Sequence, residues 1–170
     1  STEFIYARQA TPHLLLSTPL GVVHLAERHL HTDPIALEEL EGLRKEVERE
    51  VRQVKELLPD DPPPTLICTA GTATTLAILD LKLEVFDPLA IHLHTLGRET
   101  VQGLLDGLAA MTLEERRQIP FLERGREDLI IPGSVILLQT MRILGIDRFT
   151  VSETGLKEGL LLDLLEKEVH

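Results

Sequence analysis

Residues 66–81 have the sequence "LICTAGTATTLAILDL", in which a turn of small and hydroxyl residues separates two apolar runs. The runs predict a strand over 65–70 followed at once by a helix over 72–80. Gly71 lies at the junction, where the lack of a Cβ permits an unusual backbone angle and the close approach of a ligand. Thr72 adds a hydroxyl group, and the free N–H groups of a helix start favour an anion. Such turns also occur as plain connectors, so the stretch alone leaves phosphate binding and simple chain reversal open.

The rest of the chain predicts the same alternation of strands and helices. Two short apolar segments, 3–8 and 13–19, flank a polar connection and predict an antiparallel hairpin. Two later strands are expected at 88–97 and 148–153, parallel to the strand at 65–70. Strands that lead into helices through short turns indicate an α/β fold with a central mixed sheet flanked by helices. A long helix is expected from Pro34 to Leu58, with Asp33 as its cap, and a stiff proline-rich connection follows at 59–64. Another long helix is expected over 125–145, with a start or kink at Pro132. The other expected helices are 21–31, 98–111, 112–119 and 155–168.

Composition limits the classes of function. The chain has 170 residues, 43% of them hydrophobic, which suits one compact domain with its own core. A net charge of −11 argues against attraction to the anionic backbone of a nucleic acid. Four Phe, one Tyr and no Trp leave few aromatic side chains for base stacking, so nucleic-acid binding is not expected. No apolar run has the length of a membrane span, and the first residues lack a signal-peptide pattern, so we expect a cytoplasmic protein without membrane contact. The single cysteine, Cys68, has apolar neighbours and is expected to be a buried thiol.

Two groups of histidines raise the question of a zinc site. His92 and His94 lie two residues apart on an expected strand, hence on one face, and His24, His29 and His31 cluster near a helix end. Imidazole is a common zinc ligand. No third ligand or matching carboxylate stands at a motif spacing, so surface or half-buried histidines are the favoured interpretation.

Four segments of the sequence carry a combined pattern: "STEF" (1–4), "CTAGTATTLA" (68–77), "GREDLIIPGSVILL" (125–138) and "TVSETGLKEGLLLDLL" (150–165). The most specific part is the pair "R-x-D-x-I-x-x-G" (126–133) and "VS-x-x-G-L-x-E-G-L-L-L-D-L-L" (151–165). Taken in order, the segments resemble the second actin-like domain of the exopolyphosphatase and guanosine pentaphosphate phosphohydrolase (Ppx/GppA) family.

The resemblance implies the architecture of the chain. It implies an α/β fold of the ribonuclease H-like type, found in the actin-like ATPase superfamily, with a central mixed sheet whose first strand is missing. Residues 1–170 are then a single C-terminal actin-like domain, a fragment of a larger protein. An N-terminal companion domain would precede it, carrying another phosphate loop and the glutamate that activates water.

The resemblance also implies roles for particular residues. Ser1, Thr2 and Glu3 match the tail of an Asp-x-Gly-Gly-Gly-Ser-Thr-Glu phosphate loop, whose aspartate and glycines are not in this sequence. Glu3 would be the catalytic residue and the metal ligand, binding Mg²⁺ or orienting water, because Mg²⁺ prefers oxygen ligands. Ser1 and Thr2 would bind phosphate, and Gly71 and Thr72 would form a second phosphate cradle.

Arg126 is the remaining candidate for a phosphate contact. It would reach back toward the cleft; the alternative is a helix cap or a surface ion pair with Glu127 or Asp128. Two positions depart from the family pattern, because Thr154 and Lys157 stand where many relatives have arginines. This departure weakens the case for a phosphate contact from the last helix.

Three functions follow as hypotheses. The first is the C-terminal half of a Mg²⁺-dependent hydrolase that releases terminal phosphate from inorganic polyphosphate or guanosine pentaphosphate; the isolated chain is then expected to be inactive. Such an enzyme mainly supplies positioning, a divalent ion and hydrogen-bond donors. The second is a non-catalytic module that senses phosphate or a nucleotide. The third is a dimerisation domain, in which the apolar helix 134–144 also packs between chains of a homodimer.

Overall fold

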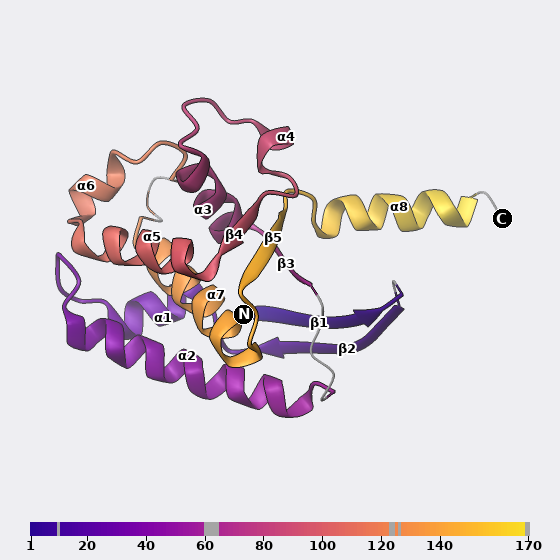
Figure 1. Ribbon diagram of the computed structural model, residues 1–170, viewed down its shortest axis with the longest axis horizontal. Helices are drawn as coiled ribbons and strands as arrows, with labels where there is room; N and C mark the ends of the chain where they lie inside the picture. Colours follow the sequence, from indigo (N-terminus) through magenta and orange to yellow (C-terminus); the bar gives the residue numbers. More distant parts are fainter. Residues whose placement is uncertain (10, 60–64, 123–124, 126, 169–170) are drawn as a thin grey trace.

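The computed structural model describes residues 1–9, 11–59, 65–122, 125 and 127–168. The connection expected at 59–64 therefore lies almost entirely outside the described residues. Figure 1 shows a helical body from which a hairpin and the last helix, α8 (Leu156–Glu168), extend on the same side. Among the described residues, no helix combines the length and the apolar character needed to cross a bilayer.

The hairpin is formed as predicted. Its strands are β1 (Thr2–Arg8) and β2 (Thr11–Thr18), which pair antiparallel with Thr2 opposite Thr18 and Glu3 opposite Ser17. One face of the hairpin carries Phe4, which packs against the core, and Tyr6, which is buried. Because side chains alternate along a strand, Glu3 lies on the other, exposed face.

A second, mixed sheet contains the other three strands. β3 runs parallel to β5, as predicted, but β4 runs antiparallel to β5, so the prediction of a third parallel strand is wrong. Leu93 N donates to Val151 O and Val151 N donates to His94 O, both at 2.8 Å. The chain thus enters β4 from the carboxyl end of β5 and must run in the opposite direction. The strands are, in order across the sheet, β3 (Leu66–Thr69), β5 (Arg148–Ser152) and β4 (Thr95–Gly97).

The segment expected as a strand at 88–97 is a strand only at its end. It begins with a short helix, α4 (Pro88–Ile91), whose cap is the Asp87 carboxylate. That carboxylate accepts hydrogen bonds from Leu89 N and Ala90 N at 3.0 and 3.2 Å. An aspartate cap followed by proline is a local helix-start signal, and here it outweighs the alternation of apolar residues.

The helix α7 (Ile130–Leu144) forms the centre of the core. Of its 15 residues, 12 are buried, so most of its surface is used within the chain; packing between chains, the third hypothesis, stays a prediction. Pro132 lies in the first turn, where its missing N–H has no helical partner, which confirms the expected start. The helices packed against α7 are α1 (Val22–His29), α2 (Leu37–Leu57), α3 (Gly71–Leu81) and α5 (Arg98–Ala110).

The start of α2 differs from the prediction. The helix begins at Leu37 and not at Pro34, because Asp33 is engaged elsewhere: its Oδ1 accepts a hydrogen bond from Leu113 N at 2.8 Å. The expected apolar stripe is buried over most of its length. By contrast, the short capped helix α6 (Leu113–Arg117) is confirmed, with a reciprocal capping box between Thr112 and Glu115. The buried residues of α2 are Leu40, Leu43, Val47, Val51 and Val54.

Candidate active site

The unusual backbone angle in the turn between β3 and α3 belongs to Ala70, one residue before Gly71, where the sequence analysis expected it. Ala70 has φ 80° and ψ 177°, a region that is otherwise occupied almost only by glycine. Gly71 is the first residue of α3 and is exposed, and a Cβ added to it would meet nothing within 4 Å. The first helical hydrogen bond runs from Thr74 N to Ala70 O at 3.2 Å. The N–H groups before Thr74 therefore have no partner within the helix, and the N–H groups of a helix start favour an anion.

The Thr72 side chain lies against α7. A Cβ added to Gly133 would stand 2.1 Å from Thr72 Oγ1 and 2.8 Å from Thr72 Cγ2, so only glycine fits at this position. Thr72 is half-buried. This contact explains the glycine that ends the 126–133 motif, and it anchors the first turn of α3 on the central helix.

Hydroxyl groups gather where β3 and β5 end side by side. Thr69 Oγ1 and Ser152 Oγ both donate to Thr154 O, at 3.1 and 2.7 Å. Thr74 Oγ1 donates to the Glu153 carboxylate at 3.2 Å. The carboxyl ends of parallel strands are the usual ligand edge of an α/β sheet, so the β3–α3 turn lies where a substrate would be expected.

A side chain of the same helix, Glu158, caps the start of α8. Glu158 Oε2 accepts a hydrogen bond from Gly155 N at 2.7 Å, and this bond lowers the pKa of the Glu158 carboxyl. Thr154 and Lys157, the two departures from the family pattern, are exposed. An anion at this helix start would have to displace the Glu158 carboxylate.

Glu3 forms a second group of candidate residues with two serines. Ser1 Oγ donates to Glu3 Oε1 at 2.6 Å, and Ser17 Oγ, opposite on β2, donates to the same oxygen at 3.4 Å. The Ser1 hydrogen bond is the main reason why the pKa of Glu3 is lowered, so the exposed carboxylate is an anion near neutral pH. Ser17 was missed because only the strand register brings it here.

Thr2 points away from this group. Its Oγ1 donates to Leu20 O at 2.7 Å, and Thr2 O accepts from Thr18 Oγ1 at 2.9 Å. These bonds tie the beginning of β1 to the end of β2. The hydroxyl proton of Thr2 is therefore used in a contact within the chain.

The structure describes two separate groups among the predicted site residues. Within the described ranges, no hydrogen bond or ion pair joins the Glu3 group to Gly71 or Thr72. Arg126 lies outside the described residues. Asp128, two positions further along the chain, forms an ion pair with the buried side chain of Arg116, with 2.7 Å between Asp128 Oδ1 and the guanidinium nitrogen. Nothing in the described chain therefore places Arg126 at either group.

His94, His29 and His92 bond to other groups of the chain. His94 Nε2 bonds to the Asp80 carboxylate at 2.7 Å and His29 Nε2 to the Glu46 carboxylate at 2.6 Å. His92 Nδ1 accepts from Glu153 N at 3.3 Å, which places this ring near the carboxyl end of β5. In the part of the chain that the structure describes, no three His, Cys, Asp or Glu side chains form a metal-binding group.

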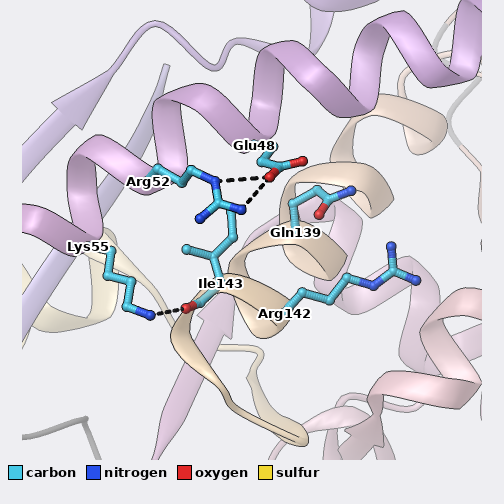
Figure 2. Close-up of a pocket in the computed structure, with 6 residues that line it drawn as sticks. All are labelled: Glu48, Arg52, Lys55, Gln139, Arg142 and Ile143. Carbon is cyan, nitrogen blue, oxygen red and sulfur yellow. Dashed lines mark hydrogen bonds and ion pairs between the residues drawn. The ribbon is translucent and has the colours of Figure 1, made fainter.

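A shallow polar groove between α2 and α7 lies apart from both groups. Figure 2 shows Arg52 paired with Glu48, and Lys55 donating to Ile143 O at 2.8 Å. Arg142 donates to Gln102 at 2.6 Å. The cations of the groove are thus used in contacts within the chain, and none of its residues belongs to the predicted site. The groove is lined by Glu48, Arg52, Lys55, Gln139, Arg142 and Ile143.

Comparisons with known proteins agree on one family. Residues 1–168 match the Ppx/GppA phosphatase family. Exopolyphosphatase 2 of Mycobacterium tuberculosis is 32% identical over 152 residues, which cover 87% of this chain and 48% of that protein. Exopolyphosphatase 1 of Mycobacterium leprae is 27% identical over 161 residues, covering 92% of this chain and 46% of that protein.

The fold agrees with a solved structure of the same family. The crystal structure of the Ppx/GppA family member of Aquifex aeolicus superposes with a TM-score of 0.91 at 30% identity, covering 99% of this chain and 54% of that chain. This chain thus spans about half the length of the relatives that it matches. With a match over nearly every residue and an actin-like α/β fold in common, the chain belongs to the Ppx/GppA phosphatase family.

Proposed function

We propose that this chain is the C-terminal half of a phosphohydrolase that releases terminal phosphate from inorganic polyphosphate or guanosine pentaphosphate. The observation that carries the proposal is the β3–α3 turn, where Ala70 has a positive φ, the exposed Gly71 begins α3, and the N–H groups before Thr74 have no partner within the helix. Exopolyphosphatases among the relatives favour a phosphoanhydride as that anion. Phosphoryl transfer needs mainly such donors and correct positioning.

Glu3 is the residue of this chain that fits a Mg²⁺ ion. It is an exposed carboxylate with a lowered pKa, held in place by Ser1, and Mg²⁺ is commonly bound through one or two carboxylates together with water and substrate phosphate. When bound, Mg²⁺ would neutralise charge on the transferred phosphoryl group. Ser1 orients the carboxylate, and the N–H groups of Gly71 and Thr72 hold a phosphate oxygen.

The remaining groups are proposed to come from a companion domain that precedes this chain. The matched relatives are about twice as long, and this chain contributes one carboxylate and one backbone cradle to the proposed site. Removing several members of a group that acts as a unit abolishes most of the rate. The isolated chain is therefore expected not to release phosphate.

The test measures phosphate release by the isolated chain and by the intact protein that carries the companion domain, with and without a chelator of divalent ions. Glu3→Gln in the intact protein is expected to lower kcat by about 100-fold or more. Glu41→Gln, at an exposed carboxylate of α2, is the matched control and should leave kcat unchanged. Metal-dependent turnover by the isolated chain, or full activity of Glu3→Gln, would overturn the proposal.

A non-catalytic phosphate-sensing module is the second candidate. The observation that favours it is the start of α8, which Glu158 closes and where arginines are lacking. In that case the intact protein binds polyphosphate by calorimetry, yet releases no phosphate in the presence of Mg²⁺.

A further inference from the structure

The segment between α4 and β4 carries two half-buried histidines that bond to residues near the proposed phosphate turn. His92 Nδ1 accepts a hydrogen bond from Glu153 N at 3.3 Å, directly after the end of β5. His94 Nε2 bonds to the carboxylate of Asp80, in the last turn of α3, at 2.7 Å. One short segment therefore contacts both the carboxyl end of β5 and the helix that follows the phosphate turn.

A tight turn fixes the path of this segment. His94 N donates to Ile91 O at 3.0 Å, and His92 has φ −62° and ψ 128°. Leu93 has φ 66°, as the third residue of a type II turn does, a position that glycine usually occupies. Leu93 N donates to Val151 O and His94 O accepts from Val151 N, both at 2.8 Å. These bonds hold the leucine in a conformation that it rarely adopts, and they keep His92 at the end of β5.

Glu153 is held through both its main chain and its side chain. Besides the bond from its N–H to His92, its carboxylate accepts a hydrogen bond from Thr74 Oγ1 at 3.2 Å. Thr74 lies in the first turn of α3, and its N–H makes the first hydrogen bond of that helix, to Ala70 O. The contacts thus run from His92 through Glu153 to the first turn of α3.

The bond from Glu153 N also distinguishes the two nitrogens of the His92 ring. A ring nitrogen that accepts from an N–H group carries no proton, so the proton of the neutral ring is on Nε2. An asparagine at position 92 would carry its amide close to the place of Nδ1, and a glutamine would carry it close to the place of Nε2. The two substitutions therefore separate a role of the Nδ1 acceptor from a role of the Nε2 donor.

We propose that His92 and Glu153 are positioning residues that hold the first turn of α3, and with it the phosphate turn, against the end of β5. The inference rests on the proposed function, in which Gly71 and Thr72 hold a phosphate oxygen. His92 acts through Glu153, and Glu153 acts through Thr74. Loss of either bond lets the first turn of α3 move and weakens phosphate binding.

Phosphate release from polyphosphate by the intact protein, which carries the companion domain, tests the role of His92. His92→Leu removes the acceptor and is expected to raise KM about 5-fold, because one net hydrogen bond is lost. His92→Asn should restore most of the affinity, and His92→Gln should behave like His92→Leu. A folding defect lowers the amount of active enzyme, and hence the apparent kcat, but leaves KM unchanged. His24→Leu, at an exposed histidine of α1, is the matched control and should change neither constant.

A double-mutant cycle tests whether the contacts act as one series. Thr74→Val keeps the shape of the side chain, removes the hydroxyl bond to Glu153, and should also raise KM about 5-fold. Because both bonds hold the same residue, the variant with both changes should show much less than the roughly 25-fold rise of two independent effects. A full 25-fold rise would show that His92 and Thr74 act separately, against the proposal.

Three further results would overturn the proposal. The first is an unchanged KM for His92→Leu. The second is rescue by His92→Gln and not by His92→Asn, which would mean that Nε2 contacts the substrate directly. The third is a ¹⁵N spectrum of His92 that places the ring proton on Nδ1.

Calorimetry with tripolyphosphate separates this proposal from the proposed function. If the intact protein binds tripolyphosphate but releases no phosphate, the proposed function fails. A Kd that is about 5-fold higher for His92→Leu, and restored by His92→Asn, then supports the positioning role. Absence of tripolyphosphate binding by the intact protein would refute both.

Discussion

Gly133→Ala tests the contact that anchors the phosphate turn. The new Cβ would lie 2.1 Å from Thr72 Oγ1, 2.8 Å from Cγ2 and 3.0 Å from Cβ, closer than atoms approach in folded proteins. Overpacking of this kind costs about 1–3 kcal/mol or more, and the better helix propensity of alanine returns about 1 kcal/mol. We therefore expect the free energy of unfolding to fall by up to about 2 kcal/mol, and the start of α3 to shift.

The assay is urea unfolding followed by circular dichroism, in a double-mutant cycle with Thr72→Ala. That change removes two of the three close atoms, so the cost of Gly133→Ala should be smaller in its background, with a coupling energy of about 1 kcal/mol. Gly107→Ala, at an exposed helix position with nothing within 4 Å, is the control and should stabilise by about 0.5–1 kcal/mol. Stabilisation by Gly133→Ala, or an equal cost in both backgrounds, would refute the reasoning.

Two further predictions concern β3 and its turn. Ala70→Gly should raise the free energy of unfolding by about 1 kcal/mol, because relief of about 1–3 kcal/mol of backbone strain exceeds the greater freedom of glycine in the unfolded chain; a lower midpoint of urea unfolding would contradict this. Burial raises the pKa of the Cys68 thiol to about 12, so iodoacetamide at pH 8 should react with it only in urea. Because the folded pKa is the higher one, the contribution of Cys68 to stability is complete below the unfolded pKa and is lost as the pH rises toward 12; rapid labelling of the folded chain would show that the thiol is accessible.

The sequence was sufficient where local patterns and family motifs carry the information. The strand, glycine and helix at 66–81, the hairpin, the capping box of α6 and the start of α7 near Pro132 all follow from the order of neighbouring residues, since propensity, capping and alternation act over a few positions. The motif at 126–133 indicated the family correctly. The motif did not explain its own glycine, because the reason lies in Thr72, which is 61 residues away in the chain.

Tertiary structure decided the features that depend on residues distant in sequence. Strand β4 runs antiparallel because Leu93 and His94 bond to Val151, and α2 begins late because Asp33 is used by Leu113. The strained angle belongs to Ala70 and not to Gly71, since the neighbouring strand and helix together determine the path of the turn. Ser17 reaches Glu3 only through the strand register. The sequence alone determined which segments form and to which family they belong; long-range contacts, whose energies no local pattern encodes, decided how those segments face one another and which side chains meet at the proposed site.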